Sequence, residues 1–187
     1  MNWEIDLNCD MGEGMPNDAV IIPYVSSISI ACGGHAGNKD SIRETIQLAK
    51  RANVSIGAHP SYPDRENFGR KKMDIPYSSL EESLISQLSI IRAIASEENY
   101  PLVHLKPHGA LYNQAAIDPV LAQLIVTISK NMDPRWSIWG LPNSALATCC
   151  ATQSVQFIPE GFADRSYQPD GSLTPRSHPH ALVETKE

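Results

Sequence analysis

Apolar residues recur with a helical period in three segments of the chain, and this predicts three amphipathic helices. The longest covers residues 78–98, where Ser79 and Glu82 fit a capping box. Asp118 and Pro119 fit the N-cap and first turn of the second helix, and Asp40 is expected to begin the third. A weaker fourth helix is predicted over 143–151. The periodic apolar positions of the longest helix are Leu80, Leu84, Leu88, Ile91 and Ile94.

Short runs of β-type residues lie between these helices. Their alternation with helices indicates parallel βαβ units and a single α/β domain, because no Gly-, Ser- or Pro-rich linker divides the chain. The irregular stretch 59–77 is long for a connection, so we expect an active-site loop there. The predicted strands are 4–8, 27–31, 54–58, 102–106, 136–140 and 155–159.

The run HLKPHGALYN, residues 104–113, places charged or polar side chains at every second position. If the backbone stays extended, His104, Lys106 and His108 share one side of a strand. Such a side is either a solvated face or part of a functional pocket. The rest of the chain favours the pocket.

Ionisable residues follow the carboxyl ends of most of the predicted strands. In a parallel βα fold these ends meet, so the residues are expected to share one pocket. Small inward residues of the second and third strands would leave room there for a substrate, or for the side chains of Lys106 and His108. These small residues are Ser29, Ala31, Gly33, Ser55 and Gly57.

Individual roles stay open at this level. Lys106 either neutralises a carboxylate or phosphate of a ligand, or forms a buried ion pair with Asp6 or Asp10. Asp10 and Glu13 are each a base, a metal ligand or a cap for the glycine-rich turn. His35 follows two glycines that would let the backbone approach a ligand, or it is a loop histidine bonded to a carbonyl.

Arg165 stands beside Asp164 after the last predicted strand, in the segment EGFADR that Glu160 begins. The pair is either a structural salt bridge or a clamp for an anionic substrate.

Composition excludes several classes of function. The net charge is −6 and there is no basic run, which argues against nucleic acid and anionic membrane partners. The start has no secretory leader and no run approaches the about 18 apolar residues of a membrane span, so a cytoplasmic protein is expected. Its four cysteines lack CxxC spacing and are expected to be reduced thiols.

With these residues in view, the chain closely resembles the LamB/YcsF family, whose members form the A component of 5-oxoprolinase. The resemblance spans nearly the whole chain, and its signatures are long and unusual. They are IDLNCDMGEG (5–14), IPYVSSISIACGGHAG (22–37), IGAHPSYPDRENFGR (56–70), LKPHGALYN (105–113) and EGFADRSYQPDGSLTPRS (160–177).

The resemblance implies a TIM-like β/α barrel of the glycoside hydrolase/deacetylase type. It implies ATP-dependent hydrolysis of 5-oxoproline to L-glutamate, with ATP carried as its Mg²⁺ complex and with 5-oxoprolinase subunits B and C as partners. On that reading a carboxylate of Asp10 or Glu13 activates water, His35, His59 and His108 move protons, and Lys106 holds phosphate or substrate. Substrate contacts are expected from Asp6, Asn8, Asn113, Glu160, Asp164 and Arg165.

Two departures from the family are expected to matter. The connection after GEG is short, and residues 1–187 are expected to form a single barrel domain that lacks the last elements of the family. Only six strands are predicted, so the barrel is expected to be incomplete at its C-terminal end, with unpaired sheet edges.

Two other functions compete with this one. A metal-dependent amide hydrolase or deacetylase would use the convergence of Asp6 and His108 with the candidate metal ligands Asp10, His35 and His59. Against it, there is no HExxH motif, and His104 and His108 on one strand would lie too far apart to share an ion. The other alternative is a non-catalytic substrate-binding subunit or a truncated copy.

Overall fold

The computed structural model describes residues 5–183, and these form one six-stranded sheet. All five strand pairs are parallel and the strands follow one another in sequence order. The strands are β1 (Asn8–Met11), β2 (Ser27–Ala31), β3 (Ser55–His59), β4 (Leu102–Leu105), β5 (Ser137–Gly140) and β6 (Phe157–Pro159).

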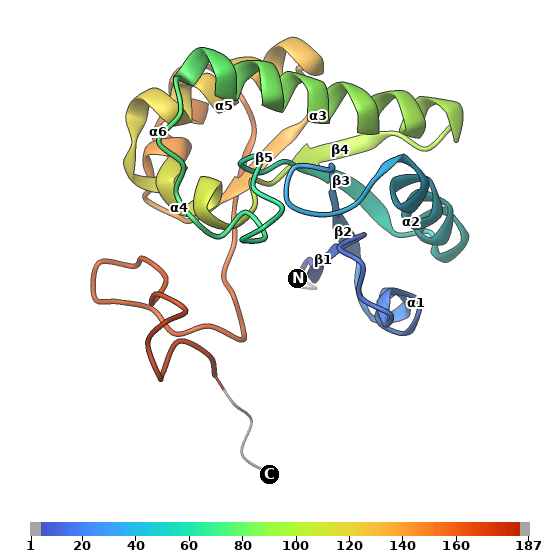
Figure 1. Cartoon of the computed structure of the whole chain (residues 1–187), viewed down its shortest axis with the longest axis horizontal. Helices are drawn as coiled ribbons and strands as arrows, with labels where there is room; N and C mark the ends of the chain where they lie inside the picture. Colours follow the sequence, from blue (N-terminus) through green and yellow to red (C-terminus); the bar gives the residue numbers. More distant parts are fainter. Residues whose placement is uncertain (1–4, 184–187) are drawn as a thin grey trace, which may run out of the picture.

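Helices connect the strands, and α2, α3 and α5 lie together on one side of the sheet (Figure 1). Apolar residues of these helices and of the strands form the buried core, with Ile28, Ile56, Leu84 and Ile91 almost fully covered. The helices are α1 (Asp18–Ile21), the 3₁₀ turn η1 (Ile22–Tyr24), α2 (Lys39–Ala52), α3 (Tyr77–Glu97), α4 (Gly109–Ile117), α5 (Pro119–Met132) and α6 (Ala145–Thr152).

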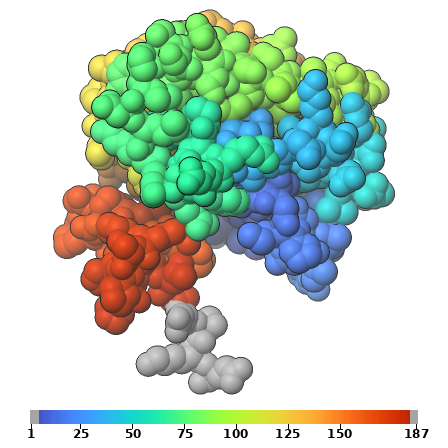
Figure 2. Space-filling model, in the orientation of Figure 1, coloured from blue at the N-terminus to red at the C-terminus, as the bar shows by residue number. Residues whose placement is uncertain are grey.

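The sheet is an open half-barrel. Within residues 5–183, β1 pairs only with β2 and β6 pairs only with β5, so the two outer strands do not meet. The segment after β6 forms a separate lobe beside the main body (Figure 2). The predicted α/β class and its parallel strands are confirmed, and the open sheet is consistent with a TIM-like barrel.

Five of the predicted strands lie within two residues of the observed ones, whereas the first was placed too early. Strand β1 begins at Asn8, and the predicted residue 4 lies outside the described residues. Ile5 and Leu7 alternate with polar residues as in a strand, but they are 82% and 55% exposed. The alternating pattern was therefore present without the burial that it usually reports.

Helix starts were predicted with mixed success. Asp118 caps α5 as expected, with its carboxylate accepting hydrogen bonds from the backbone of Val120 and Leu121. The start of α2 at Asp40 is wrong, because Asn38 is the N-cap.

The capping box of Ser79 and Glu82 is also wrong. Helix α3 begins at Tyr77 after Pro76, without a side-chain cap, so Ser79 already lies inside its first turn.

The structure also corrects the shape of the run HLKPHGALYN. Strand β4 ends at Leu105, and His108 is the N-cap residue of α4, a helix that the sequence pattern did not predict. His108 therefore does not continue the strand face of His104.

None of the helices in the described part of the chain is both long and apolar enough to cross a membrane.

Candidate active site

The imidazole of His104 fills the interior of the half-barrel beside Gly57. The registered positions Asp10, Ser29, Gly57 and His104 form one row across β1 to β4. The ring of His104 lies where a side chain on Gly57 would stand, stacks on Trp139 at 4.4 Å and contacts Ser29 Oγ at 3.1 Å. The expected free space beside the small residues is therefore taken by this imidazole, and burial lowers the pKa of His104 to about 3.

Lys106 lies just beyond the end of β4 and forms ion pairs with two carboxylates, one on β1 and one directly after β6. Its Nζ is 3.0 Å from Asp10 Oδ1 on β1 and 3.2 Å from Glu160 Oε2, which follows β6. It also donates to Asn8 Oδ1 at 3.2 Å. The buried ion pair considered for Lys106 is present with Asp10 and not with Asp6, and it ties together strands that do not pair with each other.

Opposite charges set the protonation of this pair. Burial favours the neutral form of each group, but the charges and hydrogen bonds of His59 and Lys106 outweigh it and hold the pKa of Asp10 well below its usual range. Burial likewise disfavours the ammonium, yet Asp10 and Glu160 raise the pKa of Lys106. Asp10 is thus a carboxylate and Lys106 an ammonium, and the side chain of Asp10 keeps 31% of its surface exposed.

Three imidazoles and one carboxylate converge next to this pair. Glu13 Oε1 lies 3.0 Å from His35 Nε2 and 3.4 Å from His108 Nδ1. His108 Nδ1 lies 2.9 Å from His59 Nε2, which is also 3.3 Å from Asp10 Oδ2. The rings of His35 and His108 are stacked at 3.6 Å. We call Glu13, His35, His59 and His108 the histidine cluster.

Burial keeps two of these rings neutral. Desolvation lowers the pKa of His108 to about 2, and a positive charge on the neighbouring His59 or His35 would lower it further. Desolvation also lowers the pKa of His35, although its hydrogen bond to Glu13 acts in the opposite direction.

The loop after β3, which the sequence suggests as an active-site loop, packs against the histidine cluster. The carbonyl of Phe68 accepts a hydrogen bond from His108 Nε2 at 2.9 Å. Gly69 packs so closely that a Cβ there would come within 2.9 Å of His35 Cβ and 3.0 Å of His108 Cδ2. Gly69 also has a φ of +63°, which a glycine adopts at little cost.

Four residues predicted to contact substrate lie away from these groups. The carboxylate of Asp6 accepts hydrogen bonds from the hydroxyls of Ser26 and Ser27 at the start of β2. Asn113 is exposed on α4. Asp164 is exposed after β6. Arg165 forms no salt bridge with Asp164, because its guanidinium donates to the carbonyls of residues 174 and 181 and so holds the C-terminal lobe together.

Sequence reasoning missed two aromatic residues at the site. Tyr112 is buried, and its hydroxyl has no hydrogen-bond partner among the described residues. Its ring packs edge-on against Phe162 at 5.6 Å, and Phe162 lies 5.2 Å from Lys106 Nζ. The available signal was spacing: Tyr112 follows His108 by four residues, which places both on one face once α4 is recognised.

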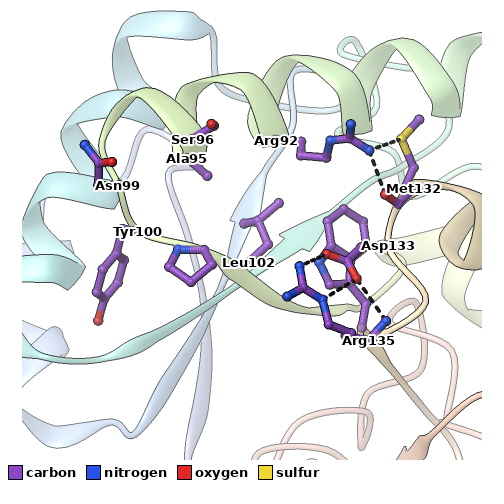
Figure 3. Close-up of a pocket in the computed structure, with 11 residues that line it drawn as sticks. Arg92, Ala95, Ser96, Asn99, Tyr100, Leu102, Met132, Asp133 and Arg135 are labelled. Carbon is purple, nitrogen blue, oxygen red and sulfur yellow. Dashed lines mark hydrogen bonds and ion pairs between the residues drawn. The ribbon is translucent and has the colours of Figure 1, made fainter.

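A surface hollow of about 460 Å³ lies at the opposite end of the sheet (Figure 3). It borders Leu102, the first residue of β4, and the ends of α3 and α5. Its polar groups pair with one another, as Arg92 donates to the carbonyl of Met132 and Arg135 pairs with Asp133. None of the predicted site residues lines it, and ligands of parallel α/β folds bind at the other end.

The fold and the polar site define an α/β half-barrel protein with ionisable residues gathered at the carboxyl ends of its strands. Residues 5–187 match the LamB/YcsF family, and the chain belongs to it. It is similar to the lactam utilization protein of Thermus thermophilus, at 34% identity and a TM-score of 0.91 over 98% of this chain and 76% of that one.

A more distant likeness concerns the fold alone. A protein of Enterococcus faecalis proposed for cellobiose-phosphate cleavage is 12% identical, with a TM-score of 0.58 over 82% of this chain and 65% of that one.

Proposed function

We propose that this chain is the A component of an ATP-dependent 5-oxoprolinase, which hydrolyses 5-oxoproline to L-glutamate together with subunits B and C. Membership of the LamB/YcsF family and the likeness to a lactam utilization protein support a lactam as substrate. We place the reaction in the cytoplasm, where ATP is available, and assign the half-barrel to the glycoside hydrolase/deacetylase type.

The observation that carries this proposal is the position of Asp10. Its carboxylate is the most exposed of the acidic groups at the site, since Glu13 and Glu160 keep only 15% and 11% of their side-chain surface. It contacts Lys106 on one oxygen and His59 on the other. A charged carboxylate in this position can orient a water molecule towards a bound carbonyl carbon.

The proposed chemistry explains the need for ATP. A five-membered lactam is a stable amide, and transfer of the γ-phosphoryl group of MgATP to its carbonyl oxygen makes C5 electrophilic and releases ADP. Water then adds to C5 and loses a proton towards Asp10. The C5–N bond breaks and the ring nitrogen takes up a proton, which leaves γ-glutamyl phosphate. A second water molecule hydrolyses this acyl phosphate to L-glutamate and phosphate.

The surrounding groups have proposed roles in the same steps. Lys106 fixes Asp10 and offsets negative charge that develops on the substrate oxygen. Asp10 then passes the proton that it took from water to the ring nitrogen. Asn8, which contacts Lys106, and Glu160 complete the wall on which the substrate lies.

Reconstitution tests this function. Glutamate release from 5-oxoproline is measured with this chain mixed with the B and C subunits, with and without ATP, and with each component omitted in turn. We expect release that requires ATP and stops when this chain is omitted. Binding of 5-oxoproline without release, while a longer family member restores turnover with the same B and C subunits, would contradict the proposal and favour a non-catalytic role.

A further inference from the structure

The histidine cluster has the dimensions of a metal site. Each of its four residues offers one ligand atom, and these atoms lie within 4.8 Å of one another. The separations are 2.9 Å between His59 Nε2 and His108 Nδ1, 3.0 Å between Glu13 Oε1 and His35 Nε2, and 3.4 Å between Glu13 Oε1 and His108 Nδ1. A zinc ion with bonds of roughly 2.0–2.1 Å to four tetrahedral ligands separates them by about 3.3 Å.

Backbone carbonyls fix which nitrogen of two rings carries the proton. His59 Nδ1 lies 2.7 Å from the carbonyl oxygen of Lys106, and His108 Nε2 lies 2.9 Å from that of Phe68. A carbonyl only accepts hydrogen bonds, so each of these nitrogens must donate. This arrangement, a second ring nitrogen bonded to a carbonyl, is the usual support of a metal-binding histidine.

The other nitrogens of the same two rings therefore face each other across a gap that a metal ion or a shared proton would fill. His59 Nε2 and His108 Nδ1 are 2.9 Å apart, a separation at which two lone pairs repel unless a cation or a proton lies between them. Both nitrogens are buried, and Glu13 Oε1 is directed at the same point. The position thus combines convergent electron pairs with a carboxylate.

We propose that Glu13, His35, His59 and His108 bind one divalent transition-metal ion of the zinc type. The inference concerns the same site as the proposed function, but it rests on the arrangement of these four side chains and not on the reaction. Imidazole-rich sites with a single carboxylate suit zinc and its neighbours, whereas Mg²⁺ and Ca²⁺ prefer oxygen ligands.

The charge around the cluster matches a dication. Glu13, Asp10 and Glu160 contribute three carboxylates, and Lys106 offsets one of them. Two negative charges are then left for a doubly charged ion, so Lys106 does not prevent binding. Asp10 stands beside the ion, 3.3 Å from His59 Nε2, without belonging to the four ligands.

Metal binding to the full chain tests this proposal without any activity measurement. The purified protein is freed of metal with a chelator, dialysed and titrated with Zn²⁺, and bound metal is measured by elemental analysis. A parallel titration with Co²⁺ reports tetrahedral coordination through its visible absorption. We expect one equivalent of zinc for each chain and no competition from Mg²⁺ in equimolar amounts.

Matched variants assign the ligands. Glu13→Gln keeps the shape of the side chain, and His59→Ala removes one of the facing nitrogens; each is expected to weaken Zn²⁺ binding at least about 100-fold. The control is His178→Ala/His180→Ala, which removes two exposed histidines in the C-terminal lobe and should leave binding unchanged. Far-UV circular dichroism confirms that each variant is folded.

Several results would overturn the proposal. Less than about one tenth of an equivalent of bound zinc in the folded wild-type chain would do so, as would wild-type affinity in folded Glu13→Gln and His59→Ala. Loss of binding only in the His178/His180 variant would place the ion elsewhere. Failure of glutamate release with zinc bound would instead count against the proposed function alone.

Discussion

Replacement of Lys106 by Met is expected to lower the free energy of unfolding by about 3 kcal/mol. Lys106 is 4% exposed, and Met retains much of its aliphatic volume while removing the charge. The carboxylates of Asp10 and Glu160 would then face each other in a confined space without their shared cation. We use the lower end of the usual range for a broken buried pair because Asp10 is partly solvated.

Urea unfolding followed by circular dichroism measures this change. Lys39→Met, at an exposed position on α2, is the matched control and should change the free energy of unfolding by less than about 0.5 kcal/mol. The double variant Lys106→Met/Glu160→Gln should recover part of the loss, since it removes one of the unpaired charges. Equal stability of Lys106→Met and Lys39→Met would show that the ion pair does not hold the outer strands together.

Substitution of Gly57 by Ala is expected to cost about 2–3 kcal/mol, because it overpacks the interior of the half-barrel. A Cβ at Gly57 would overlap Cδ2 and Nε2 of His104, a contact that no side chain tolerates. The imidazole is 1% exposed and stacked on Trp139, so it has no free space to move into. Any displacement also breaks its contact with Ser29.

The same unfolding measurement with two further variants separates this clash from a general effect of glycine replacement. At Gly161 a Cβ would meet only the hydroxyl of Tyr167 at 3.7 Å, so Gly161→Ala should be nearly neutral. The pair Gly57→Ala and His104→Ala should be coupled, because removal of the ring makes room for the methyl group. Additive effects of these two substitutions would contradict the packing described above.

The class of fold was readable from the sequence because apolar patterns report burial. Segments whose apolar residues are buried, such as 27–31, were placed without error. Residues 5–7 show the alternation of apolar and polar residues that is typical of a strand, but their apolar side chains are not buried and they form no strand. The sequence does not reveal helix α4, because Pro107 and Gly109 indicate the end of a strand, whereas His108 is the N-cap of a helix there.

The site was predictable as a set of residues and not as a geometry. The convergence of Asp10, Glu13 and Lys106 follows from the shared carboxyl ends of parallel strands. The carbonyl of Phe68, which orients His108, leaves no trace in the side-chain sequence. Nor could spacing reveal that Arg165 turns to backbone carbonyls in place of Asp164.

The catalytic role of Asp10 is tested by the rate of glutamate release from the reconstituted enzyme carrying Asp10→Asn. This substitution keeps the size of the side chain, removes its charge and leaves the four proposed metal ligands in place. We expect a fall of at least about 100-fold in a folded protein, with Asp40→Asn on the surface of α2 as an unaffected control. Turnover of Asp10→Asn within about twofold of the wild type would show that the chemistry takes place elsewhere.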